Sequence, residues 1–363
     1  MRIAFFNWRD MRNPLAGGAE VYVHQVMKHL VAMGHPATLF TSSFPGSRPQ
    51  ESIDGILHIR YGGRFLMYPK SFACYREHVH GRYDAIVESV AGMPFFTPLF
   101  AREKVVSLIH QLTRENWFSG LPLPLAFAGY HLENHLLAPY KSRPAIAVSD
   151  STRSDLEAIG FRDVRLVHGA SDISPPEKAG KERRPTLIQV GRLVKSKRAE
   201  HSLLALRSIL GKIPSAQLWI VGSGPEEAGL RKLAAELGIS RSVTFFGWVD
   251  EEKKAWLLAR AHLGLFPAVR EGWGLTVNEA NACSTPVIGY DVPGLRDSIR
   301  PGVNGHLVPA GNHDELAETA SRLLTDGESL SALSSSAARF SKNFSWEKSA
   351  ARMADILEGC LEK

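Results

Sequence analysis

The residues most able to do chemistry are two cations and two carboxylates in the second half of the chain. Arg192 and Lys197 follow an apolar run typical of a β-strand, so both can reach the carboxyl edge of a sheet. Paired cations there would neutralise a diphosphate leaving group. Glu271 precedes a glycine-rich turn, and Glu279 lies on the expected helix that follows. Eight residues of ideal helix separate two carboxylates by about 12 Å, whereas the two carboxylates of glycosidases lie roughly 5 to 9.5 Å apart. The spacing therefore favours two carboxylates that contact different parts of one long ligand.

Glycine-rich loops stand where an expected strand meets an expected helix. Gly17-Gly18 lies between the first strand and the first helix, Gly222-Ser223-Gly224 follows a later strand, and Gly272 and Gly274 follow Glu271. Without a Cβ, such residues let backbone amides approach an anion at a helix N-terminus. The second loop lacks the third glycine of the GxGxxG fingerprint, and no acidic residue closes a following strand, which argues against NAD.

The elements that must position these residues are short apolar strands alternating with amphipathic helices, which is typical of parallel sheets covered by helices. In the first half we expect strands over 3–7, 38–41, 85–88, 105–109, 145–148 and 164–167. In the second half we expect strands over 187–190, 218–221, 243–246, 263–266 and 287–290, with helices over 199–210 and 226–237. The pattern predicts an α/β protein of two doubly wound domains that face each other across a cleft, with ligands beyond the carboxyl ends of the strands.

A polar stretch that contains Pro and Gly separates the two halves and shows no apolar periodicity. We therefore expect a first domain over 1–168, a linker over 169–185 and a second domain over 186–344. A length of 363 residues suits two domains of ordinary size.

Composition excludes several classes of protein. The net charge of +6 is spread along the chain with no block typical of a nucleic-acid tail, so we expect no nucleic-acid partner. Cys74, Cys283 and Cys360 lie far apart, which disfavours a disulfide framework or a zinc site and suits a reducing cytoplasm. The longest uncharged apolar run, residues 119–130, is too short to span a bilayer and contains two prolines. The first apolar stretch is also too short for a signal-peptide core, so we expect a cytoplasmic protein.

Six motifs in order across nearly the whole chain resemble the retaining glycosyltransferases of the GT-B fold, family four. They are GGAE at 17–20, His110 after an apolar strand, GRL at 191–193 with Lys197, VGSGP at 221–225, the pair Glu271-x7-Glu279, and PVI at 286–288 with Pro293-Gly294. The resemblance implies two Rossmann-like domains, an acceptor-side domain followed by a nucleotide-sugar donor domain. It also implies that a final helix, within 345–363, crosses back to the first domain.

The resemblance further implies a role for each matching residue. Glu279 would hold the donor ribose, and Glu271 would contact the donor sugar. Arg192 and Lys197 would stabilise the departing diphosphate, and His110 would lie beside the sugar at the reaction centre. The remaining donor-binding positions implied by the resemblance are Gly17, Gly18, Gly191, Gly222, Gly224, Gly272, Trp273, Gly274, Leu275 and Thr276.

Such enzymes transfer a sugar from a nucleotide donor with retention at the anomeric carbon and without a metal or other cofactor. This chain agrees in having no Asp-x-Asp pair of the kind that metal-dependent transferases use. Nothing in the sequence nominates a nucleophilic carboxylate for a double displacement. The resemblance implies front-face attack, in which the diphosphate oxygen helps to deprotonate the acceptor. Arg198 stands where family members often have glycine, and Pro293-Gly294 where Gly-Gly is common, so these departures affect donor identity more than activity.

The acceptor side of the sequence mixes aromatic and basic groups. We expect Arg64, Tyr68, Arg114 and Trp117 to contact an acceptor, which would be a glycan, a glycolipid or a small molecule. The same residues suit peripheral contact with the inner face of the membrane. The alternative for Trp117 is a place in the hydrophobic core.

Two other functions stay open at this point. A nucleotide-sugar epimerase on the same scaffold would turn over without an acceptor. A non-catalytic nucleotide-sugar-binding subunit would bind without turnover. The sequence leaves UDP and GDP equally open as the donor nucleotide.

Overall fold

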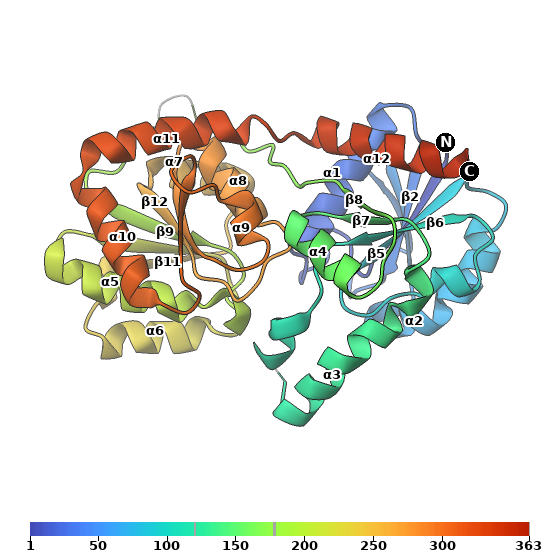
Figure 1. The fold of residues 1–363 in the computed structure, drawn as a ribbon, viewed down its shortest axis with the longest axis horizontal. Coiled ribbons are helices and arrows are strands. Elements are labelled where there is room, and N and C mark those ends of the chain that lie inside the picture. The colour runs from blue at the N-terminus through green and yellow to red at the C-terminus, as the bar shows by residue number, and fades with distance from the viewer. Residues whose placement is uncertain (120, 177–178, 363) are drawn as a thin grey trace. The chain divides into compact units, whose positions relative to one another are not determined.

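The computed structural model describes residues 1–119, 121–176 and 179–362, which form two compact units (Figure 1). Unit 1 comprises Met1–Ala170 and the residues from Phe344 onward, and unit 2 comprises Ser171–Asn343. Each unit contains one sheet of mainly parallel strands with helices packed against it (Figure 1).

Unit 1 is built on an eight-stranded sheet with the order β3-β4-β2-β1-β5-β6-β7-β8. β3 runs antiparallel to β4, and the other pairs are parallel, with Ile3 of β1 opposite Ala37 of β2 and Ala85 of β5. Its strands and helices are β1 (Ile3–Phe6), α1 (Gly18–Ala32), β2 (Ala37–Ser42), β3 (Gln50–Ile53), β4 (Ile56–Tyr61), α2 (Gly63–Cys74), a π-helix (Tyr75–Val79), β5 (Ala85–Val90), β6 (Lys104–Ile109), α3 (Leu123–Leu136), β7 (Ala145–Ala147), α4 (Asp150–Ala158), β8 (Val164–Leu166) and α12 (Trp346–Leu361). Short 3-10 helices cover Thr97–Leu99, Arg114–Ser119 and Ala138–Tyr140.

Unit 2 is built on a six-stranded parallel sheet with the order β11-β10-β9-β12-β13-β14. Its strands and helices are β9 (Thr186–Val190), α5 (Ala199–Lys212), β10 (Gln217–Val221), α6 (Glu227–Glu236), β11 (Val243–Gly247), α7 (Glu251–Arg260), β12 (Leu263–Phe266), α8 (Leu275–Ala282), β13 (Val287–Tyr290), α9 (Leu295–Ser298), β14 (Gly305–Val308), α10 (His313–Thr325) and α11 (Gly327–Ser341). Short 3-10 helices cover Lys195–Lys197 and Ser240–Ser242.

The strand order reverses once in each sheet, between β1 and β5 in unit 1 and between β9 and β12 in unit 2. Loops that leave two neighbouring strands in opposite directions open a crevice at such a point, where ligands of doubly wound sheets bind. The central strands β1 and β9 are buried along their whole length, as parallel strands covered on both faces must be. The rigid core therefore fixes the loops that follow these strands.

The chain returns to unit 1 through α12. Trp346 is 2% exposed and packs edge-on against Tyr22 of α1, with 5.5 Å between the ring centroids. Ser349 donates a hydrogen bond from its Oγ to the carbonyl of His168 at 2.7 Å. These contacts make the C-terminal helix part of the core of unit 1.

The expected linker over 169–185 includes residues 177 and 178, which lie outside the described residues. Its last part packs on unit 2 because the Lys181 ammonium donates to the carbonyls of Ala261 and Ser284 and to Thr285 Oγ1, at 2.7 to 2.9 Å. Glu182 pairs with Arg260 at 2.6 Å. These residues are anchored because the Lys181 side chain donates to two carbonyls and a hydroxyl of unit 2 and the Glu182 side chain forms an ion pair with Arg260.

Three strands were absent from the sequence expectations: β3, β4 and β14. β4 carries His58 and Arg60, whose polarity resembles that of a loop, yet both side chains are buried. β3 is a polar edge strand, and β14 is only four residues long. Along the described residues, no helix is long and apolar enough to cross a membrane.

Candidate active site

Four loops at the carboxyl edge of the unit 2 sheet are joined by backbone hydrogen bonds. The Leu193 amide donates to the Ser223 carbonyl at 2.9 Å, which ties the loop after β9 to the loop after β10. The Val269 amide donates to the Ser196 carbonyl at 2.8 Å, and the Glu271 amide donates to the Pro293 carbonyl at 3.1 Å. The loops after β9, β10, β12 and β13 therefore form one continuous surface around the point where the strand order reverses.

Glycines permit this close approach. A Cβ on Gly222 would lie 2.0 Å from the Gly191 carbonyl oxygen, and one on Gly224 would lie 2.2 Å from the Leu193 carbonyl oxygen. A Cβ on Gly294 would lie 2.2 Å from the Glu271 carbonyl oxygen. Gly222 and Gly224 thus pack against protein backbone, a role that the expectation of a simple anion cradle did not include.

The cations and the first carboxylate lie on this surface. The Lys197 ammonium forms a hydrogen-bonded ion pair with Glu271 Oε1, and their side chains are 27% and 16% exposed. Arg192 is exposed, and its guanidinium has no polar partner among the residues that the structure describes. The structure therefore brings Lys197 and Glu271 together and leaves Arg192 available to a ligand.

Glu279 forms a second ion pair that the sequence did not indicate. Its Oε1 lies 2.9 Å from the Lys254 ammonium, and both side chains are nearly buried, at 13% and 14% exposed. Its Oε2 is buried and has no hydrogen-bond partner in the described parts of the chain. Burial raises the pKa of the Glu279 carboxyl, against the opposing effect of the Lys254 charge. Lys254 lies on α7, 25 residues before Glu279, so only tertiary packing reveals the pair.

Helix α8 starts at the same place with open amides. Gly274 has φ +85° in the left-handed region, which turns the chain into the helix without a side-chain cap. Leu275 and Thr276 are half-buried, in the first turn, where unsatisfied N–H groups and the helix dipole favour an anion. Trp273 is only 5% exposed, so its side chain belongs to the protein interior. Gly272 before it is half-buried.

In unit 1, the Gly17-Gly18 loop closes on itself. The Gly17 amide donates to Glu20 Oε2 at 2.7 Å in a capping box, so this amide is already satisfied. Glu20 Oε1 lies 3.2 Å from Arg9 Nε, and the Arg9 guanidinium lies 4.0 Å from the centre of the Trp8 ring. Gly18 begins α1. Sequence reasoning missed Arg9, which has no motif of its own.

His110 follows β6 at the carboxyl edge of the unit 1 sheet. Its ring packs edge-on against Tyr22 at 5.2 Å, and Nε2 lies 3.3 Å from Ser89 Oγ. Burial lowers the pKa of His110 to about 4. The imidazole is therefore neutral near pH 7, so it can form hydrogen bonds but carries no charge.

The four expected acceptor residues lie on two separate elements. Arg64 is exposed at the start of α2, and Tyr68 on the same helix packs against Phe95 with 4.9 Å between the rings. Arg114 and Trp117 lie in the 3-10 helix before α3. Arg114 donates to Asn134 at 3.0 Å, and the Trp117 ring lies against Gly129, so both are tied to α3.

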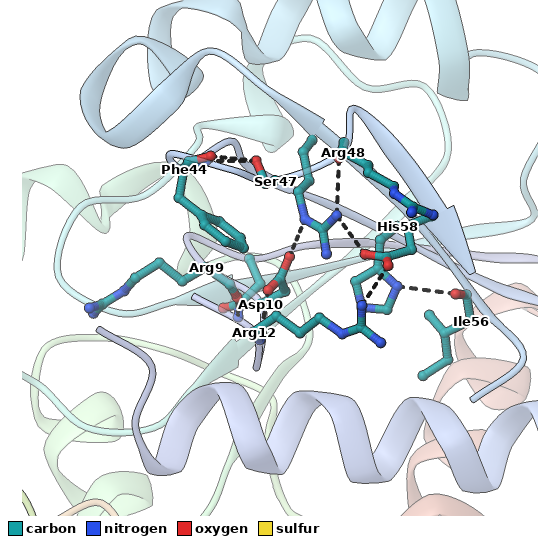
Figure 2. Close-up of polar contacts among 11 residues, drawn as sticks. Arg9, Asp10, Arg12, Phe44, Ser47, Arg48, Ile56 and His58 are labelled. Carbon is teal, nitrogen blue, oxygen red and sulfur yellow. Dashed lines mark hydrogen bonds and ion pairs between the residues drawn. The ribbon is translucent and has the colours of Figure 1, made fainter. Parts of the chain in front are cut away.

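A buried ion network holds the loops after β1 and β2 to the β3–β4 hairpin (Figure 2). Arg60 Nε donates to Asp10 at 2.5 Å, and its Nη1 donates to Glu51 at 3.0 Å and to the Arg48 carbonyl at 3.0 Å. On the solvent side of this network, Arg12 pairs with Glu51 at 2.5 Å, and the Arg12 side chain is 54% exposed. Removing one partner of such a buried pair costs about 3–5 kcal/mol, so the network fixes this edge of unit 1.

Across the described residues, no group of three or more His, Cys, Asp or Glu could hold a metal ion. The polar groups at the edge of unit 2 are the cation of Arg192, the ion pairs Lys197–Glu271 and Lys254–Glu279, and the backbone amides at the start of α8. This set suits an anionic ligand with hydroxyl groups.

Two family models match the chain. Residues 171–340 match the family described as glycosyl transferases group 1, and residues 16–174 match glycosyltransferase family 4.

Curated relatives match part of the chain. A D-inositol 3-phosphate glycosyltransferase of Thermobispora bispora is 33% identical over 186 residues, which cover 49% of this chain and 44% of that protein. A phosphatidyl-myo-inositol mannosyltransferase of Mycobacterium leprae is 32% identical over 220 residues, which cover 59% of this chain and 58% of that protein. The chain thus spans about half the length of the curated relatives it matches.

Solved structures match almost the whole chain. Sucrose-phosphate synthase from Thermosynechococcus elongatus has a TM-score of 0.84 at 23% identity, covering 99% of this chain and 98% of that chain. Anabaena Alr3699/HepE in complex with UDP-glucose has a TM-score of 0.78 at 18% identity, covering 99% of this chain and 100% of that chain. The chain therefore belongs to the group 1, family 4 glycosyltransferases and has their GT-B fold of two Rossmann-like domains.

Proposed function

We propose that this chain is a metal-independent, retaining glycosyltransferase that moves a sugar from a UDP- or GDP-linked donor to an acceptor hydroxyl. The observation that carries this proposal is the presence of two ion pairs, Lys197–Glu271 and Lys254–Glu279, at the edge of unit 2 where α8 begins. Cations, open amides and a buried carboxylate oxygen lie together there. This combination suits a diphosphate joined to a ribose.

Each part of the donor has a matching group. The diphosphate is held by Arg192 and Lys197, which offer positive charge on the loop after β9, and by the amides of Leu275 and Thr276 at the N-terminus of α8. The ribose is held by Glu279, whose unpartnered Oε2 accepts a hydrogen bond from a ribose hydroxyl. Glu271 contacts the sugar, since it lies beside Lys197.

The reaction breaks the bond between the anomeric carbon and the diphosphate oxygen and forms the new glycosidic bond on the same face. The leaving diphosphate oxygen accepts the proton of the acceptor hydroxyl, so no protein nucleophile is needed. Lys197 and Arg192 stabilise the negative charge that develops on the diphosphate. His110, which is neutral, serves as a hydrogen-bond partner of the sugar. Trapping of a glycosyl adduct on any side chain would overturn this mechanism.

The acceptor hydroxyl belongs to a glycan, a glycolipid or a small molecule bound by unit 1. The names of the curated relatives make inositol phosphate and phosphatidylinositol the first acceptors to try. We place the protein in the cytoplasm, where its three free, buried cysteines stay reduced.

The test is a transfer assay with UDP-glucose, GDP-mannose and related donors, run with EDTA and with each acceptor class. We expect product in EDTA from one donor, with the donor's anomeric configuration in the NMR spectrum of the product. An inverted product contradicts retention, and transfer that is lost in EDTA and restored by a divalent cation contradicts metal independence. Conversion of the donor sugar without acceptor favours an epimerase, and binding without turnover favours a non-catalytic subunit.

A further inference from the structure

A carboxylate that the proposed mechanism does not use is buried at the carboxyl end of β5. Glu88 is 0% exposed, and its backbone lies opposite Phe6 of β1, where the strand order of the unit 1 sheet reverses. The loop after β5 therefore lines one side of the crevice in which doubly wound sheets bind ligands, and the loop after β1 lines the other side.

Both oxygens of this carboxylate are occupied by hydrogen-bond donors. Oε1 accepts from the Phe95 amide at 2.7 Å and from the Tyr140 hydroxyl at 2.6 Å. Oε2 accepts from the amide and the hydroxyl of Thr97, at 3.1 and 2.5 Å. The Tyr140 hydroxyl accepts in turn from the Phe96 amide at 2.8 Å. Glu88 and Tyr140 thus fix three successive amides of the loop after β5.

The loop that these bonds hold has an unfavourable backbone. Phe96 has φ +61°, a left-handed conformation that costs a residue with a side chain about 1–3 kcal/mol. Burial also raises the pKa of the Glu88 carboxyl, and the hydrogen bonds from Thr97, Tyr140 and Phe95 oppose that rise. An apolar side chain would fill this buried position without the cost of desolvating a carboxyl group. Packing alone therefore does not account for a glutamate here, whereas shaping the loop does.

The loop is joined in turn to Tyr68 of α2. The Phe95 ring packs against the Tyr68 ring with 4.9 Å between the centroids. Ser71 Oγ donates to the carbonyls of Tyr68 and Phe95, at 2.6 and 3.3 Å. The Tyr68 hydroxyl forms no hydrogen bond with the part of the chain that the structure describes. Its ring is fixed and its polar end is open, which suits a contact with a ligand hydroxyl.

We propose that Glu88 is a positioning residue for the acceptor, because it fixes the loop after β5 and, through Phe95, the acceptor residue Tyr68. Glu88 is buried and both its oxygens are occupied, so it acts through the loop and not by contact with substrate. The inference rests on the proposed function, since it takes Tyr68 to contact an acceptor. It predicts that Glu88 affects acceptor binding and leaves donor binding in unit 2 unchanged.

Glu103 provides a matched control at the opposite edge of the same sheet. Its side chain is 8% exposed, and it accepts from the Tyr75 hydroxyl and from the Gly81 amide, both at 2.8 Å. It stands directly before β6, so it lies at the amino edge, away from the ligand crevice. Glu103→Gln therefore disturbs the same kinds of hydrogen bond as Glu88→Gln, at a place where no acceptor is expected.

The first measurement is transfer to D-inositol 3-phosphate and to phosphatidylinositol by the wild type and both variants. Glutamine keeps the shape of the side chain, but its NH2 group faces donors where a carboxylate oxygen accepted. Glu88→Gln should raise the acceptor KM about tenfold or more and leave the donor KM within about twofold. Glu103→Gln should leave both values unchanged. Equal effects of the two variants, or an effect confined to kcat or to the donor KM, overturn the proposal.

A second measurement needs no acceptor. Hydrogen exchange in peptides over 91–97 should be about tenfold faster or more in Glu88→Gln and unchanged in Glu103→Gln. The fluorine resonance of Tyr68 in protein labelled with 3-fluorotyrosine, identified by its loss in Tyr68→Phe, should shift in Glu88→Gln alone. Tyr140→Phe removes one hydrogen bond to Glu88 and should accelerate exchange less.

The two measurements separate this inference from the proposed function. Circular dichroism and the thermal midpoint show that each variant is folded. Unchanged exchange and an unchanged Tyr68 resonance in folded Glu88→Gln overturn the role of Glu88, whatever the transfer assay gives. If the wild type uses neither acceptor but both changes appear, the proposed acceptors are wrong and the control of Tyr68 by Glu88 stands.

Discussion

At the scale of single residues, the site in unit 2 is organised by two cation–carboxylate pairs. Lys197 neutralises Glu271, and Lys254 neutralises Glu279, so neither carboxylate stands uncompensated at this half-buried edge. The Lys197–Glu271 pair costs little free energy to reorganise, because 27% of the Lys197 side chain remains in contact with water. The sequence predicted three of the four members from motif spacing. Lys254 was not predicted because its partner, Glu279, lies on another helix, and only tertiary packing brings the two side chains together.

The first residue-scale prediction concerns Lys197. Lys197→Ala should lower kcat by about 100-fold to 1,000-fold, because its charge acts mainly on the developing diphosphate. Its ion pair is partly exposed, so the free energy of unfolding should change by less than about 1 kcal/mol. Initial rates and denaturant unfolding measure the two effects. Lys195→Ala, on the same loop and exposed, is the control and should leave the rate unchanged. An equal loss of folding in Lys197→Ala would refute the assignment.

The second residue-scale prediction concerns pH. Burial lowers the pKa of His110 to about 4, whereas the unfolded chain titrates near its ordinary value of about 6.5. The stability contribution of the neutral ring is therefore complete above pH about 6.5 and is lost as the pH falls toward 4. The loss is at most about 1.4 kcal/mol per pH unit. The free energy of unfolding of His110→Asn, measured in urea across this pH range, should change less with pH than that of the wild type.

At the scale of elements, the alternation of strands and helices was readable because parallel strands buried on both faces are continuous apolar runs. The eleven expected strands correspond to β1, β2 and β5 to β13, with ends that shift by one residue at most for most of them. β4 was missed because its buried Arg60 is compensated by Asp10 and Glu51, which lie in other segments. Ion pairs formed by the fold cannot be read from a local pattern.

The element-scale prediction concerns the loop after β10. Gly222→Ala places a Cβ on the Gly191 carbonyl oxygen and at φ +128°, where side chains are strained. The loop that carries Arg192 must then move. We expect a loss of about 2 kcal/mol or more in stability and a matching loss of nucleotide binding. Thermal unfolding and nucleotide titration measure both. Gly229→Ala on α6, where a Cβ meets open space, should be neutral or stabilising by up to about 1 kcal/mol. A neutral Gly222→Ala would contradict the packing role.

At the scale of the whole molecule, the chain builds two units and returns to the first. Family membership and structural similarity cover almost the entire length, so the GT-B architecture is firmly assigned. The donor-side residues expected in the second domain lie on loops at one edge of the unit 2 sheet, whereas the expected acceptor-side residues lie on α2 and before α3. The sequence offers motifs for a donor side because a nucleotide sugar has fixed chemistry, whereas acceptors vary and leave no common spacing.

The whole-molecule prediction concerns α12. Trp346→Ala leaves a cavity between α12 and α1, which should cost about 3–5 kcal/mol in the unfolding of unit 1. Unit 2 has its own core, so the stabilisation of its transition by a nucleoside diphosphate should persist. Calorimetry with and without nucleotide separates the two effects. Trp248→Ala, at a tryptophan that is 78% exposed in unit 2, should leave unit 1 unchanged. Loss of both transitions in Trp346→Ala would show that the units do not unfold separately.

The central claim is that unit 2 binds a nucleoside diphosphate through Glu279, and thermal stabilisation by UDP, GDP, ADP and dTDP tests it most directly. A ligand at 100 times its Kd adds about 2.7 kcal/mol, which is readily measured. We predict that one nucleotide stabilises the wild type and that Glu279→Ala, which lacks the ribose acceptor, responds far less. Failure of all four nucleotides to stabilise the wild type, or equal stabilisation of Glu279→Ala, would contradict the account.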